Sequence, residues 1–150
     1  MGEKGRLARE NFESGCNCSQ AVLLAFAPEC GLDRETALRL ASSFGGGFGR
    51  MRELCGAISG GGMALGLLRG YTDTTGDGAK KEHYRLIQTF CERFREAEGH
   101  LRCQELLDKL AGEPGPEPGA RTAEYYTQRP CGRLVARAAD LVEELLAETA

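Results

Sequence analysis

The segment Pro130–Glu148, PCGRLVARAADLVEELLAE, decides the fold class, because its apolar residues recur every three or four positions. This spacing puts them on one face of a helix, and proline suits the first helical position. The inward-facing residues are Leu134, Val135, Ala138, Leu141, Val142 and Leu145. We therefore predict a long amphipathic helix that packs against other helices.

The same spacing continues over most of the chain, and no stretch shows the alternation typical of a strand. Besides the last helix, we expect a short amino-terminal helix that carries Leu7 and Phe12 and ends at Ser14-Gly15, and helices at about 17–28, 33–44, 52–68, 79–98 and 102–111. The segment 112–119, with alternating prolines and glycines, predicts a flexible loop within the domain. We expect an all-α, single-domain, multi-helix bundle of about five to seven helices over residues 1–150.

Charge and hydropathy restrict the class of partner. The formal net charge of -3 comes from interspersed acidic and basic residues, which argues against nucleic-acid binding. No apolar run is long enough to predict a membrane span, and the amino terminus lacks the apolar run of a secretory signal. We therefore expect a cytoplasmic protein.

The seven cysteines are the main indication of function. Structural disulfides are rare in the reducing cytosol, so cysteines there more often have redox, catalytic or metal-binding roles. Because the number is odd, at least one thiol stays unpaired in any disulfide scheme within the chain.

Four cysteines fall in or beside the first turn of a predicted helix, and each begins an inward-facing apolar stripe: Cys18, Cys55, Cys103 and Cys131. Free N–H groups and the helix dipole favour the thiolate at such positions. Arginines strengthen this effect at three of the four: Arg50 and Arg52 precede Cys55, Arg102 precedes Cys103, and Arg129 and Arg133 flank Cys131. Cys18 has no such neighbour. We therefore expect Cys55 to be the nucleophile and Cys18 the resolving thiol.

The other three cysteines fit simpler roles. Cys16 lies in a predicted turn, Cys30 follows the helix-breaking Pro28, and Cys91 lies mid-helix on the core face, where it would act as a small buried apolar residue. Packing is also the alternative for each of the favoured four, since free cysteine is often buried.

The run Phe44-Gly45-Gly46-Gly47-Phe48-Gly49-Arg50-Met51, followed by Cys55-Gly56-Ala57-Ile58-Ser59-Gly60, resembles the hallmark segment of the C_GCAxxG_C_C family of proteins with an inferred redox role. Asn17-Cys18-Ser19-Gln20 is similar to its first cysteine motif, Cys103-Gln104-Glu105-Leu106 to its third, and Cys131 to its last. The similarity extends from about Phe12 to Leu146. Cys16, Cys30 and Cys91 are additions to the family pattern.

The resemblance implies a helical bacterial or archaeal protein with four characteristic cysteines, often encoded near transporter genes. A similar domain occurs in split-Soret cytochromes, where an iron–sulfur centre has been suggested. This chain lacks the Cys-x-x-Cys-His signature of attached haem, so we expect no haem.

Three hypotheses follow. The first is thiol/disulfide exchange or electron transfer, as in a thiol–disulfide oxidoreductase, through Cys18, Cys55, Cys103 and Cys131, with a redox protein or small disulfide as partner and no required cofactor. The second is a zinc or iron–sulfur site formed by the same four cysteines. The third is a non-catalytic helical partner of a transporter. The sequence leaves open whether the protein forms a homo-oligomer. At Gly56 and Gly60, where there is no side chain, a ligand could lie against the helix backbone.

Overall fold

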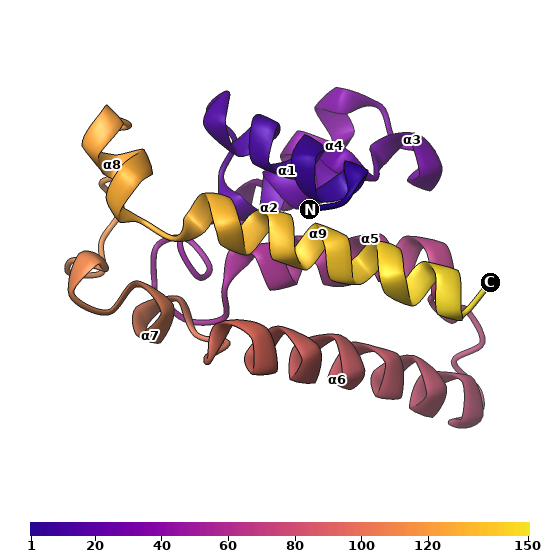
Figure 1. Cartoon of the computed structure of the whole chain (residues 1–150). Helices are drawn as coiled ribbons and strands as arrows, with labels where there is room; N and C mark the ends of the chain where they lie inside the picture. Colours follow the sequence, from indigo (N-terminus) through magenta and orange to yellow (C-terminus); the bar gives the residue numbers. More distant parts are fainter.

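A computed structural model describes residues 1–150 and is all-α, as predicted (Figure 1). Nine α-helices and two short 3-10 helices make up the fold, and no strand is present. The α-helices are α1 (Glu3–Glu13), α2 (Cys18–Ala25), α3 (Ala27–Cys30), α4 (Arg34–Ala41), α5 (Gly56–Arg69), α6 (Gly78–Glu98), α7 (Cys103–Leu107), α8 (Ala123–Gln128) and α9 (Cys131–Glu148).

Six of these helices have eight residues or more, which is within the predicted number, and three are shorter. The predicted helix at 17–28 is split at Phe26 into α2 and α3, since Pro28 has no N–H to continue the ladder. The predicted helix at 102–111 ends at Leu107 and continues as a 3-10 turn. Helix α8 was not predicted; the Thr122 hydroxyl caps it by accepting a hydrogen bond from the backbone N–H of Tyr125 at 3.2 Å.

Helix α9 is the central element, and α1, α2, α5 and α6 all pack against it. In Figure 1, α1 and α2 lie on one side of α9 and α6 lies on the other. The predicted inward stripe of α9 is buried, from Leu134 to Leu145. The amphipathic spacing therefore identified the contact face of this helix correctly.

Helices α2 and α5 approach so closely that their backbones almost touch. A Cβ atom added to Gly60 would lie 2.5 Å from the carbonyl oxygen of Ser19. Gly56 and Gly60 therefore let the start of α2 pack closely against the start of α5.

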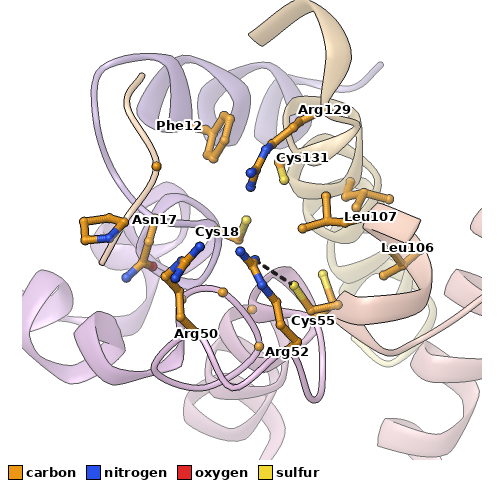
Figure 2. Close-up of a pocket in the computed structure, with 18 of the residues that line it drawn as sticks. Phe12, Asn17, Cys18, Arg50, Arg52, Cys55, Leu106, Leu107, Arg129 and Cys131 are labelled. Carbon is orange, nitrogen blue, oxygen red and sulfur yellow. Dashed lines mark hydrogen bonds between the residues drawn. The ribbon is translucent and has the colours of Figure 1, made fainter. Parts of the chain in front are cut away.

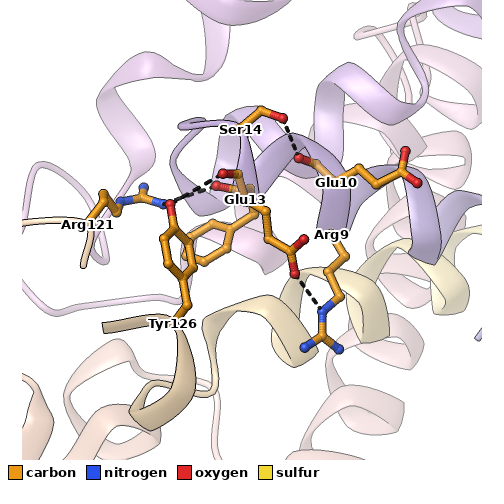
Figure 3. A network of polar contacts seen from close by, with 7 residues as sticks. Arg9, Glu10, Glu13, Ser14, Arg121 and Tyr126 are labelled. Carbon is orange, nitrogen blue, oxygen red and sulfur yellow. Dashed lines mark hydrogen bonds and ion pairs between the residues drawn. The ribbon is translucent and has the colours of Figure 1, made fainter. Parts of the chain in front are cut away.

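The end of α1 is tied to the segment that precedes α9 (Figure 3). The Arg121 guanidinium donates hydrogen bonds to the carbonyl oxygens of Phe12 at 3.1 Å and Cys16 at 3.0 Å, and it lies 4.4 Å from the centre of the Phe12 ring. The Tyr126 hydroxyl donates to the carbonyl of Glu13 at 3.5 Å. These contacts fix α8 beside the start of α9.

The predicted loop 112–119 has no regular secondary structure and is mostly exposed. Arg50 donates a hydrogen bond to the carbonyl oxygen of Gly115 at 2.8 Å, which anchors the segment to the rest of the molecule. None of the helices combines the length and apolar character that crossing a membrane requires.

Candidate functional site

The four favoured cysteines all lie at helix starts, and all line one pocket of about 420 Å³ (Figure 2). Cys18, Cys103 and Cys131 are the first residues of α2, α7 and α9, and Cys55 is the residue just before α5. Cys55, Cys103 and Cys131 are buried, whereas Cys18 is half-buried. Cys16, Cys30 and Cys91 do not line the pocket, and Cys91 is half-buried rather than buried.

Cys18 is positioned by the cap of α2. The Asn17 side chain accepts a hydrogen bond from the Gln20 N–H at 2.9 Å, and the Gln20 side chain accepts one from the Asn17 N–H at 3.0 Å. This reciprocal pair satisfies two backbone donors and fixes the entry of the chain into the helix.

A short backbone bridge positions Cys55 and Cys103 next to each other. Leu54 pairs with Arg102, the Cys55 N–H donates to the Leu101 carbonyl at 2.9 Å, and the Cys103 N–H donates to the Glu53 carbonyl at 2.6 Å. The predicted helix at 52–68 therefore begins only at Gly56, because the preceding residues form this bridge.

The glycine-rich segment before that bridge is a compact loop with left-handed backbone at Gly46, Gly47, Gly49 and three non-glycine residues, Phe48, Arg50 and Arg52. Backbone hydrogen bonds from Arg52 to Gly46 at 3.0 Å and from Glu53 to Gly47 at 2.9 Å close it. An L residue in this region costs about 1 kcal/mol or more, so the surrounding structure must impose the conformation. The result is that Arg50 and Arg52 point into the pocket (Figure 2).

Cys18 and Cys131 line the same pocket, and each thiol shifts the pKa of the other. Interaction with the Cys18 thiol lowers the pKa of Cys131, and Arg129, Arg121 and Arg52 lower it further. Interaction with Cys131, together with burial, raises the pKa of Cys18. Cys131 is therefore the thiol of this pair that ionises first.

The other two thiols are less acidic than usual. Burial raises the pKa of Cys55 to about 12, from an ordinary value of 9.0. Burial also raises the pKa of Cys103, although the Arg52 guanidinium, whose Nη1 lies 3.5 Å from the Cys103 sulfur, opposes this effect. Arg52, which precedes Cys55 in the sequence, thus acts on Cys103 and Cys131. The pKa of Cys131 is lowered, whereas that of Cys55, the expected nucleophile, is raised.

The pocket is strongly basic. Four arginines line it, and no aspartate or glutamate does: Arg50, Arg52, Arg121 and Arg129. Phe12 and Tyr125 add aromatic walls, and Pro116, Pro118 and Gly119 of the Pro/Gly segment complete the lining. The sequence predictions missed Arg121, Tyr125 and Phe12, because only the folding of α8 against α1 brings them to the thiols.

The two glycines proposed to contact a ligand differ in position. Gly56 lines the pocket, whereas Gly60 faces the backbone of α2 and does not. A Cβ atom on Gly56 would lie 2.7 Å from the Phe44 carbonyl oxygen and 3.2 Å from the Cys18 Cβ. Close packing therefore accounts for glycine at both positions.

The structure contains no group of three or more His, Cys, Asp or Glu side chains placed so that they could hold a metal ion. The zinc and iron–sulfur hypotheses stay predictions from the sequence, as does the association with a transporter.

The chain was compared with curated proteins, with solved structures and with models of protein families. No curated protein and no solved structure matches the chain, whereas a family model matches most of it. Residues 16–145 match the family model described as "Putative redox-active protein (C_GCAxxG_C_C)", a range that includes all four pocket cysteines. The chain therefore belongs to the C_GCAxxG_C_C family.

Proposed function

We propose that this protein carries out dithiol–disulfide exchange, with Cys131 as the attacking thiol and Cys18 as the resolving thiol. The observation that carries the proposal is that Cys18 and Cys131 line one pocket together with four arginines. A thiolate is the form of cysteine that attacks disulfides, and the Cys18 thiol and the guanidinium groups both lower the pKa of Cys131.

The reaction would have two steps. The Cys131 thiolate attacks one sulfur of a disulfide, R–S–S–R, forms a mixed disulfide and releases R–S⁻. Cys18 then loses its proton and attacks the Cys131 sulfur, which releases the second R–S⁻ and forms the Cys18–Cys131 disulfide. The two released thiolates take up the two protons given up by the cysteines, so two cysteine thiols are oxidised and the substrate disulfide is reduced to two thiols.

Cys55 is poorly suited to the first attack. With a pKa of about 12, it stays a protonated thiol at neutral pH. Cys103, which lies next to Cys55, is better suited than Cys55 to attack a disulfide in a second exchange reaction, because Arg52 stabilises the Cys103 thiolate.

Anaerobic titration in redox buffers, followed by alkylation and mass mapping, tests this proposal. The first disulfide formed should join Cys18 and Cys131. A Cys18→Ser variant should instead accumulate a mixed disulfide on Cys131, and a Cys91→Ser control should behave like the wild type. If the pocket cysteines remain thiols over the whole range of potentials, or if Cys131 is absent from the first disulfide, the proposal is wrong.

A further inference from the structure

We infer that the pocket selects small organic disulfides that carry carboxylates, with Arg52 and Arg129 binding the carboxylate groups. This inference rests on the exchange reaction proposed above and adds the chemical class of its substrate. It follows from the charge, the unpaired donors and the size of the pocket.

The first observation is an uncompensated positive charge. None of the four pocket arginines forms an ion pair, whereas eight basic residues elsewhere do: Lys4, Arg6, Arg9, Arg39, Arg93, Arg102, Arg133 and Arg137. Buried charges in proteins are normally paired. A cluster of guanidinium groups without carboxylates thus favours an anionic ligand.

The second observation concerns Arg52. Its side chain is only 3% exposed, and its Nε and Nη2 atoms are buried without any hydrogen-bond partner. Its Nη1 contacts the Cys103 sulfur at 3.5 Å. Buried donors of a charged group are rarely left unsatisfied, and guanidinium N–H groups match a carboxylate in a two-point contact.

Arg129 is the second group with unused donors. Its guanidinium lies 4.6 Å from the centre of the Tyr125 ring and points into the pocket near Cys131 (Figure 2). The hydrogen bond that Arg129 donates comes from its backbone N–H, to the Tyr125 carbonyl oxygen at 3.1 Å, so its side-chain donors are unused. Arg50 and Arg121 differ, because they donate to backbone carbonyl oxygens and so hold the walls of the pocket. The recognition of a substrate anion therefore falls to Arg52 and Arg129.

The size and lining indicate an organic ligand rather than a bare inorganic anion. A volume of about 420 Å³ lies within the range of small-molecule sites. Leu106, Leu107 and Leu134 offer apolar contact to the methylene groups that would link a carboxylate to a disulfide. A concave site with thiols on its lining suits such a molecule.

Three disulfides that differ mainly in charge test the inference: dithiodipropionate (a dianion), hydroxyethyl disulfide (neutral) and cystamine (a dication). The rate at which each oxidises the anaerobically reduced protein is divided by its rate with dithiothreitol. The dianion should have the highest ratio. Arg52→Met and Arg129→Ala should each raise the pKa of Cys131 and so slow attack on all three disulfides. The ratio of the dianion rate to the neutral-disulfide rate removes this common effect, and it should fall about 10- to 100-fold, the range expected for a lost charged hydrogen bond. Arg39→Ala, a remote exposed arginine, is the control.

Binding of suberate separates this inference from the proposed reaction, because suberate has the length of dithiodipropionate but no disulfide. Calorimetry on the reduced protein should detect suberate binding that Arg129→Ala weakens, and no binding of octanediol. Suberate binding without any disulfide exchange would overturn the proposed function but keep the anion site. Normal exchange with no preference for the dianion, or sulfate bound as tightly as suberate, would overturn the inference.

Discussion

Cys18 and Cys131 begin different helices at opposite ends of the sequence, and both thiols line the same arginine-rich pocket. Because the Cys18 thiol and the arginines lower the pKa of Cys131, this cysteine should react with iodoacetamide faster than the other pocket cysteines. Its rate should rise with pH through a midpoint below the ordinary thiol value of 9.0.

Replacing Cys18 tests what lowers the pKa of Cys131. In Cys18→Ala the midpoint for alkylation of Cys131 should move to higher pH, because the Cys18 thiol makes the largest contribution that lowers this pKa. Cys30→Ala, outside the pocket, serves as the control. An unchanged midpoint in Cys18→Ala would show that the arginines alone activate Cys131.

Burial of Cys55 predicts a loss of stability in alkali. Its pKa is about 12 in the folded protein and near 9.0 when exposed, so the unfolded chain loses this proton first. The contribution of protonated Cys55 to the free energy of unfolding is full below pH 9. It declines as the pH rises toward 12, by up to about 1.4 kcal/mol per pH unit. In urea titrations with a reductant, Cys55→Ala should therefore show a shallower decline above pH 9 than the wild type. Parallel curves would mean that Cys55 is not the group responsible.

Two glycines in α5 should respond to alanine in opposite directions. Gly60→Ala places a methyl group 2.5 Å from the Ser19 carbonyl oxygen, and we expect a loss of about 1–3 kcal/mol in the free energy of unfolding. Gly62→Ala meets no atom within 4 Å and should stabilise the helix by about 0.5–1 kcal/mol. Urea denaturation of the two variants measures both effects. Equal effects of the same sign would argue against the close contact of α2 and α5.

Arg121 should control the stability of the Pro/Gly segment. Arg121→Ala removes two hydrogen bonds to the backbone of residues 12–16 and the stacking on Phe12, a loss of about 1–2 kcal/mol. Limited proteolysis should then cleave between residues 112 and 122 faster than in the wild type. Arg39→Ala, at an exposed ion pair, should leave the cleavage rate unchanged.

The sequence was informative wherever structure depends on local spacing. The inward stripe of α9 and the placement of all four cysteines at helix starts were predictable, because each depends on residues within one or two turns. The pairing of Leu54 with Arg102 and the contact of Arg121 with Phe12 join distant segments. Such contacts leave no local pattern. The effect of the neighbouring Arg129 on Cys131 was therefore predictable, whereas the effects of Cys18, Arg52 and Arg121 on the same thiol were not.

The pocket wall formed by Pro116, Pro118 and Gly119 belongs to none of the helices that carry the sulfurs. Insertions or deletions there would enlarge or reduce the cavity while the thiols keep their mutual geometry, since loop length has a small effect on folding free energy. Substrate preference could thus diverge between related proteins, or be altered by loop exchange, without disturbing the reactive centre.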